Sequence, residues 1–554
     1  MSTLDWIILI ATLAGIISYG VYKSQGQHGA KTYLLADKQM PWYIVLLSVM
    51  ATQASAITFL SAPGQAYTDG MRFVQYYFGL PIAMVVICIT FIPIFQRLNV
   101  YTAYEYLEQR FDRKTRLLTA FLFLLSRALS TGISIYAPSI ILSSIMGWNI
   151  YITNIITGGL LIIYTLSGGA KAIAHTQKLQ FIIILASMAI AGFLVVDGLP
   201  EGIGFTDALR ISGKAGKLNV ISTGFDWKDR YNIWSGVIGG FFLALSYFGT
   251  DNSQVGRYLT ARDTTESRTG LLMNGLIKVP MQFLILLIGA LLFSFYSFYR
   301  APLSFNESAY QKLRLVQPVL TSEIEQEYEV IAATYEQETK KLIRNQTEHA
   351  DSFLAAGARI ETMRDSVQGL IRKYVSESDA NDTNYIFLHF VRNHLPSGLV
   401  GLLFAVIFLA SWGSISAALN SLAASSLMDM QIPAARRLPS EDRQLWLGRI
   451  HTLVWGIFCI AVAMFATRMG SLIEAVNILG SLFYGTILGI FLVAFYMRSV
   501  NGTIVFAAAV ITEAIIVIIY LQDIVSFLWL NVIGALLVMC ISTICLLFRP
   551  VRLK

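Results

Sequence analysis

Apolar residues gather in thirteen long stretches that short polar segments separate. A helix needs roughly 20 apolar residues to cross the core of a bilayer. This pattern predicts an all-α integral membrane protein with about 13 transmembrane helices. The first stretch lacks a basic leading segment and an A-x-A-like cleavage motif, so we expect it to be a retained span. The stretches lie near 5–22, 42–62, 74–96, 117–146, 149–166, 178–197, 232–250, 271–298, 396–427, 446–466, 471–497, 503–521 and 525–547.

Two longer polar segments interrupt the pattern, at 198–231 and 299–388. Within the second, apolar residues recur at helical spacing over 321–345 and 350–375, with the sequence NQTEHAD between them. We therefore expect a helical hairpin. It is either a solvated cap without chemistry of its own, or a lid or docking element for a partner.

The composition agrees with a membrane protein. Hydrophobic residues make up 55% of the 554, charged residues only 14%, and the mean hydropathy is +0.60. A soluble domain has about 25% charged residues. The net charge of +7 would fit a nucleic-acid-binding protein, but the basic residues instead crowd every second short loop. The positive-inside rule places these loops in the cytoplasm, the N-terminus outside and the C-terminus inside.

We therefore expect a multi-pass protein of a plasma membrane, the bacterial inner membrane, with the lipid bilayer as its surroundings and no nucleic-acid partner. No GxxxxGK[ST], HExxH or CxxC motif is present, so the sequence gives no support to an ATP-driven pump, zinc chemistry or an enzyme. A transport-fold receptor that signals through the external hairpin is the alternative outside the transport class.

Four predicted spans carry polar residues, which are costly in lipid and therefore point to function. The second span contains SVMATQASAITFLSAPG (48–64), and the seventh ends in YFGTDNSQVGRYL (247–259). We expect both helices to break in mid-membrane, as helices do at the sites of many secondary transporters. The alternatives are packing by small residues in the second span and an Asp251–Arg257 ion pair near the cytoplasmic interface in the seventh.

The other two polar spans are the eighth, with Lys278 in GLIKVPMQF, and the ninth, with SWGSISAALNSLAASS (411–426). Lys278 either snorkels to the interface or faces a polar cavity, and we expect the cavity. The serine hydroxyls either bond back to backbone carbonyls four residues earlier or bind Na⁺, which as a hard cation prefers oxygen ligands.

These four stretches resemble the sodium/solute symporter family, which includes sodium/glucose, proline, sialate, monocarboxylate and multivitamin carriers. YTAYEYLEQRFDRKTR (101–116), YTLSGGAKAIAHTQKLQ (164–180) and NILGSLFYGTILGIF (477–491) extend the resemblance. It covers roughly 30–545, and only the 299–388 insert is poorly accounted for. It implies a LeuT-like fold with two inverted five-span repeats and alternating access driven by a Na⁺ gradient.

The resemblance also divides the chain, with a monomer as the expected functional unit. The expected parts are a first span and cytoplasmic linker (1–41), a first inverted repeat (42–197), an external loop (198–231), a second repeat (232–497) interrupted by the insert (299–388), and two C-terminal spans (498–554).

A main Na⁺ site between the second and ninth spans is implied by the resemblance. Its carbonyl donors fall on Ala51, Ala54 and Ala410, and its two hydroxyl positions fall on Gly413 and Ser414. Gly413 offers no hydroxyl, so the site either loses a ligand or recruits water or a neighbour such as Ser416. If the ligand is missing rather than replaced, Gly413→Ser should raise the Na⁺ affinity.

A second Na⁺ site, described for some family members, needs an aspartate in a T-D-x-x-Q motif and two hydroxyls on the ninth span. Here Gln177 stands at the aspartate position, and Ser416 and Ala417 stand at the hydroxyl positions. We therefore expect that site to be absent and one Na⁺ to be bound.

The family's substrate contacts map onto residues of five spans. Lys278 among them suits either a carboxylate or a sugar hydroxyl. The leading hypothesis is a Na⁺-coupled symporter that imports a small organic solute resembling a sugar, a sialate or a monocarboxylate. A proton-coupled or uncoupled carrier is the alternative. It stays open because Gly413 lacks the hydroxyl that the family has at this ligand position. The expected contacts are Gln53, Tyr77, Tyr247, Thr250, Asp251, Lys278 and Asn477, with Phe483 and Tyr484 as an aromatic gate.

Overall fold

The computed structural model describes residues 1–24, 40–98, 102–344, 348–376, 379–434, 440–466 and 471–548. Helices dominate this part of the chain, and the one β-interaction found within it is an isolated bridge between Met40 and Ala261. The helices of the first half are α1 (Thr3–Ser24), α3 (Trp42–Gln53), α4 (Ala56–Asp69), η2 (Met71–Tyr77), α5 (Leu80–Ile89), α6 (Phe91–Leu98), α7 (Ala103–Arg110), α8 (Arg113–Met146), α9 (Ile150–Asp197) and α10 (Phe205–Lys214).

The helices of the second half run to the C-terminus. They are η3 (Ser235–Gly239), α11 (Gly240–Thr250), α12 (Asn252–Tyr258), α13 (Thr264–Phe298), α14 (Glu307–Val316), α15 (Pro318–Arg344), α16 (Ala350–Tyr374), η5 (Thr383–Tyr385), α17 (Ile386–His394), α18 (Leu399–Ser425), η6 (Ser426–Gln431), α19 (Ile432–Ala434), α20 (Glu441–Phe465), α21 (Leu472–Tyr496), α22 (Gly502–Leu521) and α23 (Phe527–Leu547).

The predicted spans coincide with apolar helices. Among the described residues, nine helices are long and apolar enough to cross a membrane, and α3 and α4 together form a tenth span that is bent by 60°. Three shorter apolar segments, Thr3–Tyr19, Ile150–Leu166 and Ser235–Thr250, lie where the first, fifth and seventh spans are predicted. The prediction of an all-α membrane protein is confirmed.

Both predicted helix breaks are present. Between α3 and α4, the Ser55 N–H donates to the Gln53 carbonyl at 3.0 Å instead of to the Ala51 carbonyl four residues back. Between α11 and α12, Asp251 is extended, with ψ at 117°, and its Oδ1 caps α12 by accepting from the Ser253 N–H at 2.8 Å. Each break frees backbone groups that a continuous helix would bond internally.

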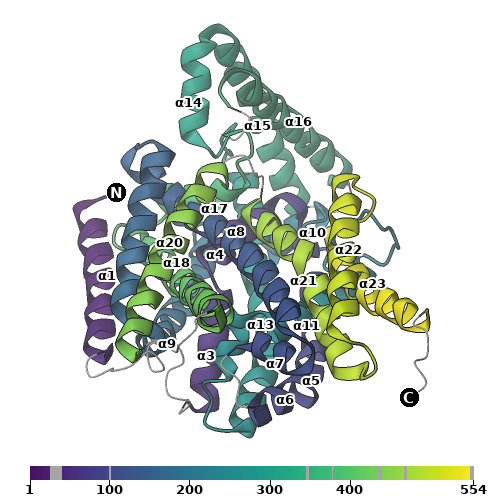
Figure 1. Cartoon of the computed structure of the whole chain (residues 1–554). Coiled ribbons are helices and arrows are strands. Elements are labelled where there is room, and N and C mark those ends of the chain that lie inside the picture. The colour runs from purple at the N-terminus through teal and green to yellow at the C-terminus, as the bar shows by residue number, and fades with distance from the viewer. Residues whose placement is uncertain are drawn as a thin grey trace, which may run out of the picture.

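Helix α18 lies at the centre of the bundle and packs against α1, α3, α8 and α9 (Figure 1). Small residues let helices approach closely in membranes. The contact between α4 and α13 depends on one of them, because a Cβ at Gly289 would lie 2.0 Å from the Pro63 carbonyl oxygen.

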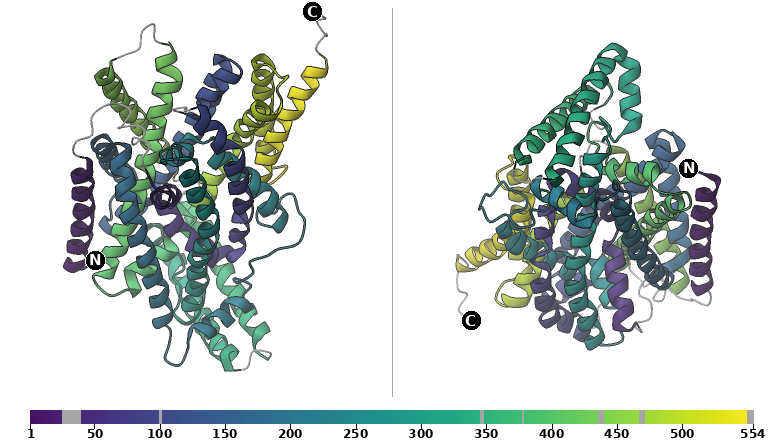
Figure 2. Two further views of the ribbon diagram at one scale, coloured as in Figure 1. Left: turned by 90° about the horizontal axis from the view of Figure 1, so that it is seen from below. Right: turned by 180° about the vertical axis from the view of Figure 1, so that it is seen from behind.

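The insert forms a helical hairpin, as the sequence predicts. Helices α14, α15 and α16 project from one end of the bundle (Figures 1 and 2), and Tyr335 of α15 stacks on Phe353 of α16 at 5.3 Å. At its base, Arg364 pairs with the buried Asp382 at 2.8 Å, and Asp382 also accepts from the Phe305 N–H at 2.7 Å. These contacts fix the hairpin to the membrane domain.

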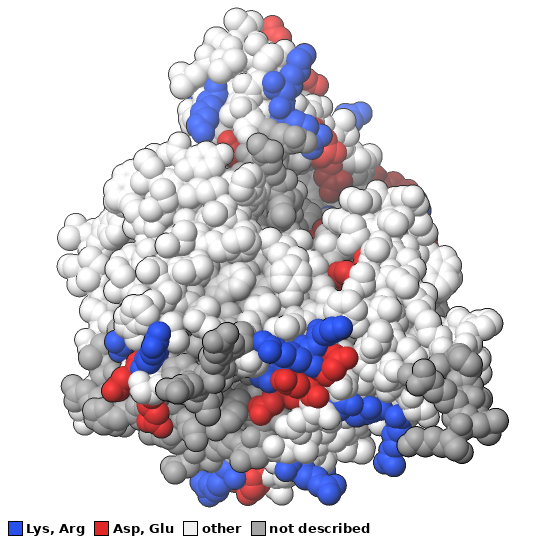
Figure 3. All heavy atoms as spheres, viewed as in Figure 1, with Lys and Arg blue, Asp and Glu red and all other residues white. Residues whose placement is uncertain are grey.

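Exposed charged side chains are distributed unevenly over the surface of the molecule. On the face drawn in Figure 3, they gather on the insert and at the opposite end, and a nearly uncharged belt separates the two groups. Such a belt suits the hydrocarbon core of a bilayer, which has no water to solvate charge. The N-terminus lies toward the end from which the insert projects (Figure 1).

Candidate functional site

A cavity of about 130 Å³ lies between the broken helices and helices α8, α13 and α21. Six of the residues predicted to contact substrate or form the gate line it: Gln53, Tyr77, Tyr247, Lys278, Asn477 and Tyr484. These residues come from five separate helices and are brought together by the fold.

Hydrogen bonds fix two of the polar groups in the wall of the cavity. The Gln53 amide donates to the Asn274 side-chain oxygen at 3.1 Å, which ties the end of α3 to α13. The Tyr76 hydroxyl donates to Asn477 Oδ1 at 3.0 Å, which ties η2 to α21. The wall is therefore pre-organised on both sides.

An arginine that the sequence analysis did not single out forms part of the lining. Arg127 of α8 forms an ion pair with Asp251, and the Tyr484 hydroxyl donates to the same carboxylate oxygen at 3.1 Å. The Arg127 guanidinium also lies 5.3 Å from the centre of the Tyr247 ring. Asp251 thus pairs with Arg127, and the predicted alternative of an Asp251–Arg257 pair is wrong. The signal was a lone charge in the apolar stretch 117–146.

Lys278 faces the cavity, as expected, and does not snorkel to the interface. Its side chain is 2% exposed, and its amine lies 5.6 Å from the centre of the Tyr77 ring. Within the described part of the chain, no ion pair or hydrogen bond to this amine is found, and no carboxylate lines the cavity. Since Asp251 pairs with Arg127, Lys278 is a basic group of the cavity for which the lining supplies no carboxylate partner.

Three of the predicted residues do not line the cavity. The Thr250 hydroxyl donates to the Ser246 carbonyl at 2.8 Å, and the Thr250 carbonyl accepts from Tyr104 at 2.9 Å. Asp251 reaches the cavity only through Arg127 and Tyr484. Phe483 is buried in the hydrophobic cluster around α5, α8 and α21.

The predicted Na⁺ ligands lie around the break in the second span and along α18. The Ser414 hydroxyl donates to the Ala410 carbonyl at 2.9 Å, so these two oxygens are adjacent. Ala54 lies in the break itself, where its φ of −80° and ψ of 73° form a tight turn, and Ala51 lies in the last turn of α3. The donors are oxygens, which is the set that a hard monovalent cation prefers.

Glutamine side chains occupy the space beside Gly413. A Cβ at Gly413 would lie 2.5 Å from Gln180 Oε1. Gln177 donates to the Gly413 carbonyl at 3.0 Å and accepts from the Ser48 hydroxyl at 2.9 Å. Ser416, one of the alternatives for replacing the missing ligand, accepts a hydrogen bond from Thr165 at 2.9 Å. Gln180 therefore occupies the space that a side chain at position 413 would need.

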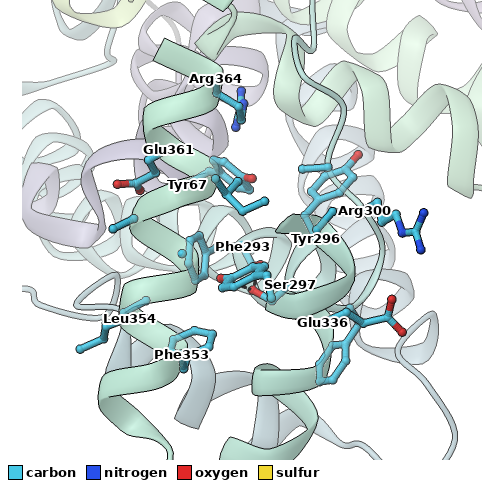
Figure 4. Close-up of a pocket in the computed structure, with 18 of the residues that line it drawn as sticks. Tyr67, Phe293, Tyr296, Ser297, Arg300, Glu336, Phe353, Leu354, Glu361 and Arg364 are labelled. Carbon is cyan, nitrogen blue, oxygen red and sulfur yellow. Dashed lines mark hydrogen bonds between the residues drawn. The ribbon is translucent and has the colours of Figure 1, made fainter. Parts of the chain in front are cut away.

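A second cavity, of about 160 Å³, lies under the hairpin (Figure 4). Tyr67 and Phe293 from the membrane domain face Phe353 of α16 across it. The Ser297 and Tyr335 hydroxyls are 3.0 Å apart, so polar groups in the lining bond to one another. Lys217, whose pKa burial lowers, lies 3.8 Å from Glu361 at its edge. This cavity therefore lies within the contact between the hairpin and the membrane domain.

Comparisons with known proteins agree with this geometry. The family model described as "Sodium:solute symporter family" matches residues 33–307 and 365–512. The sodium-coupled monocarboxylate transporter 1 of Xenopus laevis is 26% identical over 497 residues, which cover 89% of this chain and 67% of that protein. The sodium/sialic acid symporter NanT of Aliivibrio fischeri is 26% identical over 546 residues, which cover 98% of this chain and 92% of that protein.

A solved structure has the same fold. It is a Na⁺-coupled sialic acid symporter in a substrate-bound, outward-open state, and it matches with a TM-score of 0.76 and 22% identity over 99% of both chains. The LeuT-like fold expected from the sequence is confirmed by this likeness.

Proposed function

We infer the function of this chain from its place in the sodium:solute symporter family, to which it belongs. Its activity is Na⁺-coupled symport of a small solute across a membrane that the chain spans many times. We propose that the solute is a small organic anion that carries a carboxylate group.

The substrate proposal rests on Lys278, whose buried amine has no partner among the described residues. A buried cation without a partner costs several kcal/mol, and a bound carboxylate would remove that cost. A neutral sugar would leave the Lys278 charge unpaired. Both relatives described above are named for carboxylate-bearing solutes, a monocarboxylate and sialic acid. The sequence hypothesis of a sugar, a sialate or a monocarboxylate therefore narrows to the last two classes.

One segment contributes to both proposed binding sites. Gln53 lines the cavity, while Ala51 and Ala54 on either side of it are the proposed carbonyl donors to Na⁺. A bound ion would order the break and thereby position Gln53 for the solute. Each Na⁺ that enters down a potential of 100 mV supplies about 2.3 kcal/mol. One ion therefore suffices for modest accumulation of the solute.

We place the chain in a bacterial plasma membrane, with the hairpin and N-terminus outside and the C-terminus in the cytoplasm. The basic loops support this orientation through the positive-inside rule. A monomer contains the complete cavity.

The proposal is tested by uptake into proteoliposomes with a Na⁺ gradient, a pH gradient or neither. The solutes to be compared are a monocarboxylate, sialate and a neutral sugar. We expect Na⁺-driven uptake of a carboxylate and none of the sugar. Accumulation that follows the pH gradient and ignores Na⁺ would support the proton-coupled alternative instead.

The same assay tests Lys278. We expect Lys278→Gln to weaken the apparent affinity for the carboxylate by at least about tenfold, or about 1.4 kcal/mol. Lys228→Gln removes the same charge from an exposed external loop and should leave the affinity unchanged. Equal affinities in the two variants would remove Lys278 from the binding site.

A further inference from the structure

Helix α22 carries one charged residue, Glu513, in the middle of an otherwise apolar span. Ala509 and Ile516, which flank it on the same helix face, are fully buried. Glu513 therefore projects from the packed side of the helix. It lies outside both the cavity and the proposed Na⁺ site, and the family resemblance gives it no role.

The carboxyl group of Glu513 is enclosed. Both of its oxygens are shielded from solvent, and neither has a hydrogen-bond partner among the described residues. The side chain lies beside Thr486 of α21, whose hydroxyl is also buried without a partner. Two unsatisfied polar groups thus face each other across the contact between α21 and α22.

Within the part of the chain that the structure describes, no positive charge compensates Glu513. The helices packed against α22 are α8, α21 and α23, and α23 has no charged residue. The charged residues of α8 and α21 are engaged elsewhere or exposed. They are Arg116, paired with Asp429; Arg127, paired with Asp251; Glu474, paired with Arg230; and Arg113 and Lys114 in the exposed first turn of α8.

An ionised carboxylate in this position would be costly, because neither water nor a counter-ion solvates it. A bound proton removes the charge and supplies the missing donor. With the proton bound, the neutral acid would donate its O–H to the Thr486 hydroxyl, and the Thr486 O–H would point back to the second carboxyl oxygen. Both unsatisfied groups are then bonded.

We propose that Glu513 is a proton-binding site within the membrane and that its proton joins α22 to α21 through Thr486. Helix α21 also carries Asn477 and Tyr484 of the cavity, so loss of this proton would loosen the support of one cavity wall. This inference goes beyond the proposed function and does not depend on the identity of the solute.

Infrared spectroscopy of the purified full-length chain tests the protonation state. We expect the difference spectrum between wild type and Glu513→Gln to contain the carbonyl stretch of a protonated acid at neutral pH. The band should disappear on alkaline titration, with the protonated fraction falling about tenfold per pH unit above the midpoint. Absence of the band at neutral pH would overturn the proposal.

Two further measurements test the role of Thr486 and the identity of the bound ion. Thr486→Val should keep the band but shift it to higher frequency, because the acid loses its hydrogen-bond partner. An unshifted band would overturn the role of Thr486. Replacing choline by Na⁺ at fixed pH should leave the band unchanged, and its loss would instead make Glu513 a cation site. If Glu513→Gln does not fold, Glu513→Asp takes its place, because a shorter acid should shift the band.

The structural consequence has its own readout. Hydrogen exchange of α21 and α22, corrected for intrinsic rates, should rise at alkaline pH in the wild type and not in Glu513→Gln. Identical exchange in both proteins would refute the link to α21. Neither measurement requires transport, so failure here is distinguishable from failure of the proposed function.

Discussion

Ser414 and Ala410 lie one turn apart on α18, and the 2.9 Å hydrogen bond between them holds two proposed Na⁺ ligands side by side. A serine that bonds back to the helix can also be purely structural. Ser421 makes the same bond to the Ala417 carbonyl, at 3.0 Å, about two turns further along. The two serines therefore form a matched pair.

We expect Ser414→Ala to weaken the apparent Na⁺ affinity by about tenfold or more, because one hydroxyl ligand is worth at least about 1.4 kcal/mol when it binds an ion. Ser421→Ala should leave the Na⁺ dependence of uptake unchanged. Titration of uptake against Na⁺ measures both. Equal curves for the two variants would assign Ser414 to helix packing alone.

Gly413 gives a second residue-scale prediction. From the sequence, Gly413→Ser is expected to restore a ligand, but Gln180 Oε1 already lies 2.5 Å from where the Cβ would be. We therefore expect Gly413→Ser alone to lower activity, because the Gln180 side chain must move. Adding Gln180→Ala should restore activity and raise the Na⁺ affinity. A double-mutant cycle measures this coupling, and additive effects would contradict it.

His389 connects α17 to α13, and its burial predicts that the stability of the fold depends on pH. Its Nδ1 lies 2.6 Å from the Tyr296 hydroxyl, and burial lowers its pKa to about 4. The unfolded chain has a histidine pKa of about 6.5, so it binds the proton first as the pH falls. The stabilisation is complete above about pH 6.5 and is lost as the pH falls toward 4, by about 3 kcal/mol in total.

Thermal unfolding between these pH values measures the effect. We expect the wild type to lose stability across the window and His389→Gln to lose much less. His349→Gln, between the two hairpin helices, is the control and should behave as the wild type does. An unchanged acid slope in His389→Gln would show that another group titrates.

At the scale of helices, close approach through glycine determines how the outer half of the broken span meets its neighbours. A Cβ at Gly64 of α4 would lie 1.9 Å from the Thr383 carbonyl oxygen of η5. That segment lies between the hairpin and α17, so this contact joins α4 to the end of the hairpin. The hairpin is thus attached to the helix that directly follows the break in which Ala54 lies.

Gly64→Ala should therefore destabilise the protein by about 3 kcal/mol, at the upper end of what overpacking costs. Gly159→Ala in α9 is the matched control, because a Cβ there meets nothing within 4 Å. Its effect should stay within about 0.5 kcal/mol. Thermal unfolding of the two variants measures the difference. Similar unfolding midpoints would show that η5 can shift away from the added Cβ without loss of stability.

Helices and their breaks were largely predictable because they depend on local sequence. Apolar runs of span length, small polar residues in mid-span and helical spacing in the insert each leave a signal within a few turns. The docking of the hairpin left no such signal. Arg364 and Asp382 are separated by a segment that includes the end of α16, and only the fold shows that both turn inward.

At the scale of the whole molecule, the uncharged belt in Figure 3 and the basic loops predict one orientation in the membrane. In a cysteine-free background, an impermeant maleimide should label Lys340→Cys at the hairpin in intact cells. Arg113→Cys, at the start of α8, should react only after permeabilisation; both positions are exposed. The reverse pattern would invert the proposed topology.

The sequence by itself determined the position of the apolar helices, the two breaks, the hairpin and the expectation that Lys278 faces a cavity. These follow from hydrophobicity and from the cost of polar groups in lipid, which act on each segment separately. The tertiary structure alone decided which charges are balanced. Arg127 and Asp251 are 124 residues apart, and their pairing leaves Lys278 without a carboxylate partner among the residues described around the cavity. Two other contacts also depend on the tertiary structure: Gln180 fills the space beside Gly413, and Glu513 lies beside Thr486. In each case helices distant in sequence meet, and only their packing determines which side chains come into contact.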